Sequence, residues 1–242
     1  MSSRDQILDR IRAALTAVPG PAIMPDVPTV WPAGNQSCTG LLREFEASLT
    51  AVGGETVTCR SKEEAAECIE ALLKEIDARK IGIANRKIVS ETLACADCFG
   101  VDAPDFERFD APEVAGNVSP PEIATLDASV IGAEYLLADT GSAVVASASA
   151  FDRMLCYLPP VCCVVATGQM LREHLPAAWP EICQRIKGKP TDSPDLDQSV
   201  PIQDHGEFLI VTGPSRTADI EKILVMGVHG PKRLIVFVLE EG

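Results

Sequence analysis

The chain has 242 residues, of which 46% are hydrophobic and 23% are charged. This composition is typical of a globular protein with a substantial core, and it excludes a disordered chain. The 35 acidic residues outnumber the 21 basic ones, giving a net charge of −14, which argues against a nucleic-acid binder and against attachment to anionic lipid surfaces.

The N-terminal segment predicts an amphipathic helix followed by an extended arm. Residues 3–17 place Ile7, Leu8, Ile11 and Leu15 on one helical face. Residues 19–32 then contain five prolines, which disfavour regular structure. We therefore divide the chain into a helix and Pro-rich arm over 1–36 and an α/β domain over 37–242. Packing of the arm on a neighbouring subunit, and hence a homo-oligomer, stays open as an alternative.

The remaining pattern alternates strands with helices, which indicates an α/β fold with a mainly parallel sheet. Ser61 and Glu64 have the spacing of a capping box. The apolar run 161–166 is typical of a strand buried on both faces. Residues 98–121 give no clear assignment. In chain order we expect helices from the cap Thr39 to residue 53, over 61–78, over 151–158 and over 169–187; strands over 56–59, 81–84 and 161–166; two strands within 128–147; and a strand–loop–helix–loop–strand unit over 208–239.

The sequence favours a cytoplasmic protein without a metal or cofactor of its own. The segment after Met1 lacks the apolar core of a signal peptide, and no apolar run approaches the roughly 20 residues of a membrane helix. Nine cysteines include the pair Cys95 and Cys98 and the neighbours Cys162 and Cys163. Neither these cysteines nor the three histidines have the spacing of a zinc or iron–sulfur site. Buried thiols such as Cys59, Cys68 and Cys156 are the expected interpretation.

A polar segment between the apolar runs 208–211 and 234–239 is the first candidate site. Polar loops beside strand ends often hold the chemistry of α/β proteins. We expect a turn at Gly213 and a helix capped by Ser215 or Thr217, whose free amides would hold an anion. The alternative is a well-capped structural turn.

Charged side chains in this segment define its expected chemistry. Arg216 would bind a carboxylate or phosphate, whereas Asp219 and Glu221 in the same turn would partly repel an anion. His229, flanked by glycines, would act as a general acid or base. We expect Arg216 and His229 to face residues 139–141.

The second candidate site is the segment 132–142, which ends in Asp139-Thr140-Gly141-Ser142. Asp-Thr-Gly occurs in aspartic proteases, but their chemistry needs two carboxylates from two lobes or subunits. A single copy among βα units argues against a protease. A tight turn with special backbone angles at Gly141 is the plain interpretation, and a functional one adds the carboxylates of Glu134 and Asp139.

Together these segments predict one site. The expected catalytic residues are Arg216, His229, Asp139 and Glu134. The expected ligand-binding residues are Thr140, Gly141, Ser142, Thr212, Gly213, Pro214, Ser215, Thr217, Asp219, Glu221 and Gly230.

The order and spacing of the motifs resemble the LutC/YkgG family, the LUD-domain group named for lactate utilisation. The likeness rests on residues 132–135, 139–142, 158–160, 212–221 and 227–231. Where relatives often show Glu-Thr-Gly, this sequence has Asp139-Thr140-Gly141, with a shorter carboxylate. The resemblance makes 37–242 the LUD domain and implies a three-layer α/β/α fold similar to the NagB/RpiA/CoA-transferase group.

The resemblance also implies a role with two partner proteins in oxidising L-lactate to pyruvate. The iron–sulfur cysteines of that system belong to the partners, including a longer LUD protein with a ferredoxin-like extension. This chain ends at Gly242 without that extension, as expected of the cofactor-free member. We therefore expect an accessory component that binds iron–sulfur partners or a small hydroxy or keto acid. The alternative is a free-standing transferase, isomerase or hydrolase acting on a small anionic metabolite, such as a CoA ester or sugar phosphate.

Overall fold

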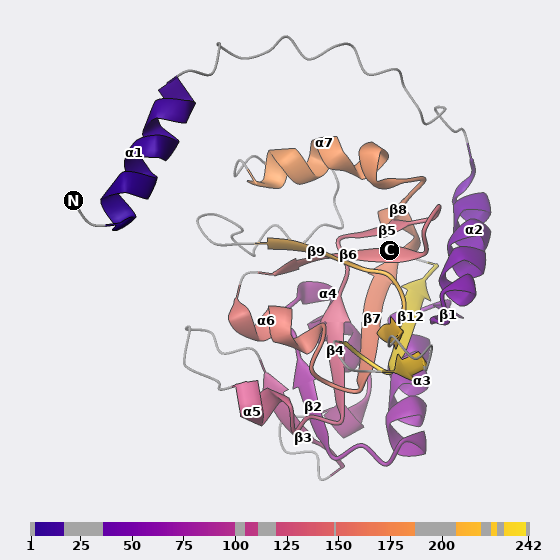
Figure 1. Cartoon of the computed structure of the whole chain (residues 1–242). Coiled ribbons are helices and arrows are strands. Elements are labelled where there is room, and N and C mark those ends of the chain that lie inside the picture. Colours follow the sequence, from indigo (N-terminus) through magenta and orange to yellow (C-terminus); the bar gives the residue numbers. More distant parts are fainter. Residues whose placement is uncertain are drawn as a thin grey trace. The chain divides into compact units, whose positions relative to one another are not determined.

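The computed structural model describes eight stretches of the chain (Figure 1). The chain divides into two compact units, Met1–Asn35 and Gln36–Gly242. In the first unit, the expected N-terminal helix is confirmed as α1 (Ser3–Thr16). Ile7, Leu8 and Ile11 are exposed on it. Among the described residues, no helix combines the length and apolar character needed to cross a membrane. The described stretches are residues 3–16, 36–99, 105–110, 120–147, 149–186, 207–218, 224–226 and 230–240.

The second unit alternates helices and strands, as the sequence predicts. Its helices are α2 (Cys38–Ala51), α3 (Lys62–Glu75), α4 (Lys87–Leu93), α5 (Pro120–Ile123), α6 (Ala150–Leu155) and α7 (Leu175–Ile186). Its strands are β1 (Glu55–Cys59), β2 (Lys80–Ile83), β3 (Glu107–Asp110), β4 (Ala128–Gly132), β5 (Tyr135–Leu137), β6 (Ser142–Ser147), β7 (Val161–Thr167), β8 (Leu171–Arg172), β9 (Glu207–Val211), β10 (Arg216–Ala218), β11 (Leu224–Met226) and β12 (Arg233–Leu239).

Six strands form a parallel central sheet in the order β1-β12-β7-β4-β2-β3. The strand β7 lies inside this sheet, and all seven of its residues are buried. Its apolar run is therefore explained by packing on both faces. A smaller sheet has the order β8-β5-β6-β9, and β10 pairs with β11 in a separate hairpin.

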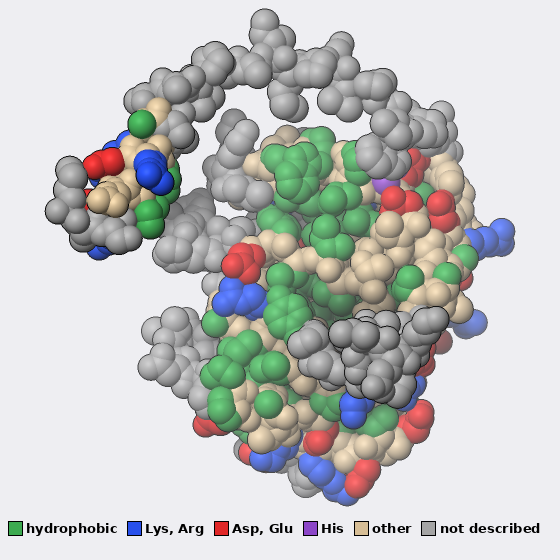
Figure 2. Space-filling view, in the orientation of Figure 1, with side chains coloured by type: hydrophobic (Ala, Val, Ile, Leu, Met, Phe, Trp, Pro, Cys, Tyr) green, Lys and Arg blue, Asp and Glu red, His purple; other side chains and the backbone are tan. Residues whose placement is uncertain are grey.

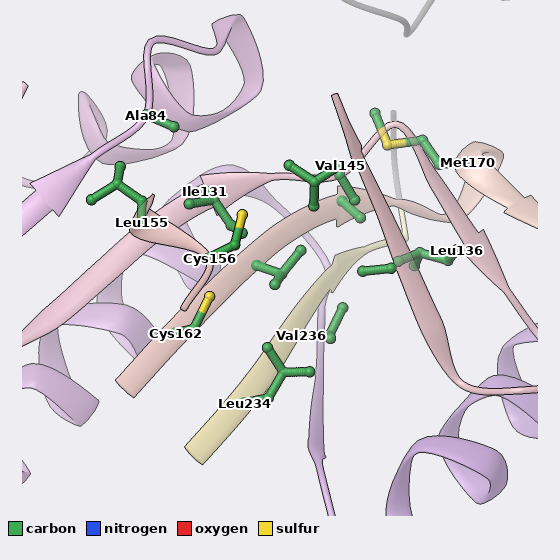
Figure 3. Close-up of a cluster of buried hydrophobic side chains, with 14 of the residues drawn as sticks. Ala84, Ile131, Leu136, Val145, Leu155, Cys156, Cys162, Met170, Leu234 and Val236 are labelled. Carbon is green, nitrogen blue, oxygen red and sulfur yellow. The ribbon is translucent and has the colours of Figure 1, made fainter. Parts of the chain in front are cut away.

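Two hydrophobic clusters cover the two faces of the central sheet, which makes the fold a three-layer α/β/α architecture. On one face, Cys163, Val165 and Phe237 pack with the buried residues of α3 and α4. On the other, Cys162, Val164, Leu234 and Val236 pack with α2, α6 and the smaller sheet. Figure 3 shows part of this second cluster, including Leu155, Cys156 and Leu136. The successive strand residues alternate between the two clusters because neighbouring side chains point to opposite faces.

The smaller sheet buries its other face against α7. Tyr135, Leu137 and Val144 form a third cluster with Ala178 and Ile182 of that helix. Hydrophobic side chains also remain at the surface of this unit: Figure 2 shows them among charged groups on the visible face, and the exposed large ones include Leu158, Trp179 and Ile210.

Serine side chains begin several helices. Ser61 accepts a hydrogen bond from the backbone N–H of Glu64, which confirms the serine half of the expected capping box at α3. The Glu64 carboxylate accepts a hydrogen bond from the Arg60 N–H. Ser149 caps α6 in the same way. The expectation for α2 was wrong by two residues, because Ser37 rather than Thr39 accepts the capping bond from the Gly40 N–H. A serine hydroxyl on an extended residue satisfies an amide that the first helical turn leaves free.

Three expected elements differ from the structure, and one unassigned stretch contains a strand. The segment 128–147 holds three strands rather than two, and the unassigned stretch 98–121 contains β3. The helix expected over 169–187 begins only at Leu175, after a 3-10 turn (Gly168–Met170) and β8. The helix expected in the C-terminal unit was wrong: residues 216–218 and 224–226 pair as an antiparallel hairpin.

Candidate functional site

The turn from Ala138 to Gly141 joins β5 to β6 and packs directly against α2. Gly141 has a φ of +63°, a left-handed conformation that favours glycine. A Cβ at this position would lie 2.2 Å from the backbone nitrogen of Leu49. The Ser48 hydroxyl also donates to the Asp139 carbonyl. The special role expected for Gly141 is confirmed, and close approach of the α2 backbone adds a second reason for it.

A chain of hydroxyl groups connects this turn to the end of β9. The Thr140 hydroxyl donates to Asp139 Oδ1 over 3.2 Å, and the Ser142 hydroxyl donates to Thr140 Oγ1 over 2.8 Å. Ser142 and Thr212 share a further hydrogen bond of 2.6 Å. The antiparallel pairing of Ala143 with Val211 brings them together. The structure thus joins four expected site residues, with Asp139 and Thr140 exposed and Ser142 buried.

The residues after Thr212 form a turn held by backbone contacts. Gly213 has a φ of +77°, and a Cβ there would meet Val52. Gly213 and Pro214 are buried. The Ser215 N–H donates to the Pro231 carbonyl over 2.8 Å, and a Cβ on Gly230 would lie 3.1 Å from Ser215 Cβ. Gly213, Ser215 and Gly230, which were expected to bind a ligand, therefore make close packing or backbone contacts within the protein.

The anion cradle expected at a helix start after Ser215 was wrong. Arg216 and Thr217 lie in β10, whose backbone pairs with β11, so these residues do not begin a helix. A strand presents no cluster of free amides of the kind that a helix N-terminus offers. Asp219, Glu221 and His229 lie outside the described residues, as do the side chains of Arg216 and Thr217. The expected approach of Arg216 and His229 to Asp139 stays a prediction.

Glu134 lies apart from this turn, in a buried cluster of charged side chains. Glu134 follows β4, and Arg86 follows the adjacent strand β2. Arg86 Nη1 lies 2.9 Å from Glu134 Oε1, and Arg185 of α7 donates to Glu134 Oε2. The side chains of Arg86, Glu134 and Arg185 are only 5%, 3% and 5% exposed. Arg86 also donates to the Ala146 carbonyl of β6, so the cluster links both sheets to α7.

Sequence reasoning found Glu134 but missed both of its partners. The signal at Arg86 is a charged residue in the short loop that follows an apolar strand. Gly132 is the matching signal on β4, because a Cβ there would come within 3.3 Å of the Arg86 Cβ and Cγ. No local pattern points to Arg185, which is 51 residues from Glu134 in the sequence.

A further ionic group fixes α7 to the small sheet. The Tyr135 hydroxyl donates to Glu181, and Arg172 binds the same carboxylate at 3.1 Å. The Arg172 guanidinium lies 5.2 Å from the centre of the Tyr135 ring. Burial, together with the Glu181 carboxylate, raises the pKa of Tyr135 well above its usual value. Tyr135 therefore stays a neutral hydrogen-bond donor at physiological pH.

The cysteines are all free thiols. Burial raises the pKa of Cys162 to about 12. Burial also raises the pKa of Cys98 to about 11, and the hydrogen bond to the Glu70 carboxylate is the second cause of that increase. Cys59 and Cys156 are buried as expected, whereas Cys68 is partly exposed. Within the ranges that the structure describes, no three His, Cys, Asp or Glu side chains are grouped so that they could hold a metal ion.

Comparison with known proteins identifies the family to which the chain belongs. The LUD domain matches residues 42–239, which is most of the sequence. The chain belongs to the LUD domain family. The solved structure of a DUF162 family protein from Deinococcus radiodurans is similar with a TM-score of 0.52 and 17% identity, covering 84% of this chain and 99% of that one. That likeness shows the fold.

Two relatives with higher identity confirm the resemblance to the LutC/YkgG family. The uncharacterized protein YkgG of Escherichia coli K12 is 28% identical over 133 residues, which are 55% of this chain and 52% of that protein. Lactate utilization protein C of Bacillus pumilus is 28% identical over 113 residues, which are 47% of this chain and 42% of that protein. The matched segments thus span about half the length of these relatives or less.

Proposed function

We propose that this LUD-domain protein acts in L-lactate utilisation, as a component of a system that oxidises L-lactate to pyruvate. The observation that carries the proposal is the match of a LUD-family chain to Lactate utilization protein C. The relation lies in the domain itself, since the LUD match extends over residues 42–239.

In this proposal the redox centres belong to iron–sulfur partner proteins. The nine cysteines lack the repeated spacing and closing Cys-Pro of an iron–sulfur signature. This spacing supports a division of labour in which the chain binds a partner or a small acid and the partners transfer electrons.

The surface proposed to bind a partner is the hydroxyl chain together with the loop that follows it. Asp139 and Thr140 are exposed at the turn, and Thr212 connects to them through Ser142. Arg216 and His229 are proposed to complete this surface, with His229 as the group that exchanges protons near neutral pH. Hydroxyls and a guanidinium suit a polar or acidic binding partner.

Growth on L-lactate tests the role directly. We expect that removing the gene abolishes growth on L-lactate as sole carbon source while growth on pyruvate continues. The wild-type gene should restore growth, and a tagged copy should co-purify with iron–sulfur proteins. Unchanged growth of the deletion strain would contradict the proposal.

Two variants test the proposed surface within the same strain. We expect Arg216→Ala and His229→Ala to fail to restore growth although both proteins accumulate and fold. Arg12→Ala on the exposed face of α1 is the matched control and should restore growth fully. Purified chain that alone oxidised L-lactate, or turned over CoA esters or sugar phosphates, would instead support the free-standing enzyme.

A further inference from the structure

The order in which the chain adds strands to the parallel central sheet reverses between β2 and β4. These strands are neighbours in the sheet. The chain leaves β2 through α4, whose Val89 and Leu93 pack on one face of the sheet. After β4 it reaches α6, whose Phe151 and Leu155 pack on the opposite face. Adjacent parallel strands whose connections leave toward opposite faces define a topological switch point, and ligands of open α/β sheets bind outside the strand carboxyl ends at such points.

The two residues that follow these strands carry opposite charges and meet at the switch point. Arg86 lies three residues after the end of β2, and Glu134 two residues after the end of β4. Gly132 leaves room for the Arg86 side chain to cross toward Glu134. Arg185 reaches the same carboxylate from α7. The place where the topology predicts a ligand is therefore occupied by one of the protein's own carboxylates.

Hydrogen-bonding capacity of Arg86 is left unused in this arrangement. Its Nη1 is buried and makes no hydrogen bond, although it lies 2.9 Å from Glu134 Oε1. A buried donor without an acceptor destabilises the fold. A purely structural cross-link would gain by satisfying this donor, and a guanidinium binds a carboxylate best through two parallel hydrogen bonds.

We propose that Arg86 and Arg185 form the binding site for the carboxylate of a small organic acid, and that Glu134 occupies this site when no ligand is bound. The ligand carboxylate displaces Glu134 from Arg86 and accepts the hydrogen bond that Nη1 does not make to Glu134. Small 2-hydroxy and 2-oxo acids are the ligand class, and that choice rests on the proposed function. The hydroxyl turn at Ser142 remains a separate surface.

Calorimetric titration of the full chain tests this site, with sodium L-lactate and sodium pyruvate as probes and sodium chloride at matched ionic strength as the blank. We expect saturable binding of at least one acid to the wild type. Arg86→Met should abolish that binding, and Arg86→Lys, which keeps the charge but loses the two-pronged geometry, should weaken it. Arg172→Met is the matched control, because Arg172 binds Glu181 outside the switch point, and it should bind as the wild type does.

Glu134→Gln distinguishes a competing internal carboxylate from a structural one. The amide keeps the size of the side chain and an acceptor for Arg185 but removes the charge that competes with the ligand. We expect the affinity for the acid to rise about tenfold, the scale of one hydrogen bond to a charged group. Unchanged or weaker binding by a folded Glu134→Gln protein would overturn the proposal, as would wild-type protein that binds neither acid.

The outcomes also separate this site from the proposed function. Arg86-dependent binding in a protein whose gene is dispensable for growth on L-lactate would keep the site and reject the function. A gene required for that growth, whose product binds no acid, would keep the function and reject the site. If Arg86→Met fails to fold, Arg86→Lys and Glu134→Gln still decide between the alternatives.

Discussion

Glu134 and Asp139 are only five residues apart, yet the structure places them in opposite environments. Glu134 is buried between two guanidinium groups at the carboxyl ends of β2 and β4. Asp139 is exposed on a turn and accepts a hydrogen bond from the neighbouring Thr140 hydroxyl. The environment of a carboxylate therefore depends on where the fold places it and not on its distance along the sequence. One region is a charged and enclosed cluster, whereas the other is a chain of hydroxyl groups that runs from the buried Ser142 to the exposed Thr140 and Asp139.

The largest expected effect comes from removing the buried carboxylate. Glu134→Ala leaves two guanidiniums without this shared partner, and breaking a buried ion pair in this way lowers the free energy of unfolding by about 3–5 kcal/mol. Urea unfolding followed by circular dichroism measures the loss. Asp139→Ala is the matched control in the exposed region and should change the free energy by less than about 0.5 kcal/mol. Similar losses for both variants would remove the contrast between the two regions.

In the exposed turn, the stability of the fold should depend on Gly141 more than on the charge of Asp139. Gly141→Ala would strain a left-handed residue and push a Cβ into the backbone of α2, which should destabilise the protein by about 2–4 kcal/mol. Gly40→Ala within α2 is the control, because a Cβ there meets only ordinary contacts. The control should be neutral or stabilising by up to about 1 kcal/mol in thermal unfolding. A tolerated Gly141→Ala would contradict the close approach of the turn to α2.

The hydroxyl chain should contribute less than either of these. Ser142→Ala removes the group that connects Thr140 with Thr212, and the expected loss is about 1 kcal/mol. Combining Ser142→Ala with Thr212→Val tests the link, since residues that share a hydrogen bond give effects that do not add. Strict additivity in denaturant unfolding would mean that the two hydroxyls act independently.

The smallest expected effect is a pH dependence at the other end of the central sheet. The hydrogen bond from Arg233, the main cause, holds the pKa of Glu55 below its usual value of 4.5. A lowered carboxyl pKa stabilises the folded state above the unfolded pKa, and this contribution is lost as the pH falls through the folded value. Because the pair is largely exposed, Glu55→Gln should lower stability at neutral pH by under about 0.5 kcal/mol. At a pH below the folded-state pKa of Glu55, the variant and the wild type should have the same free energy of unfolding. A difference that grew as the pH fell would contradict the assignment.

Local patterns predict the parts of this fold that depend on neighbouring residues. The apolar run of β7, the cap at Ser61 and the conformation of Gly141 follow from hydrophobicity, hydroxyl spacing and glycine geometry. The prediction of a C-terminal helix was wrong because short apolar runs fit a helix or a strand equally well. Leu224 lies in a strand that pairs with β10.

The two candidate regions differ in the same respect. Ser142 and Thr212 belong to motifs that stand out in the sequence, so the sequence alone predicted that their region is a candidate site. The partners of Glu134 come from α7 and from the end of β2, and only the folded topology brings Arg86 and Arg185 to one carboxylate. Long-range charge clusters of this kind leave little trace in a sequence, because each member looks like an ordinary polar residue.

A crystal structure of the wild-type protein with pyruvate is the most direct test of where a small acid binds. We expect the pyruvate carboxylate within hydrogen-bond distance of Arg86 Nη1, with Glu134 displaced from that guanidinium. Pyruvate bound at the Ser142–Thr212 hydroxyls instead, with the Arg86–Glu134 pair unchanged, would contradict it.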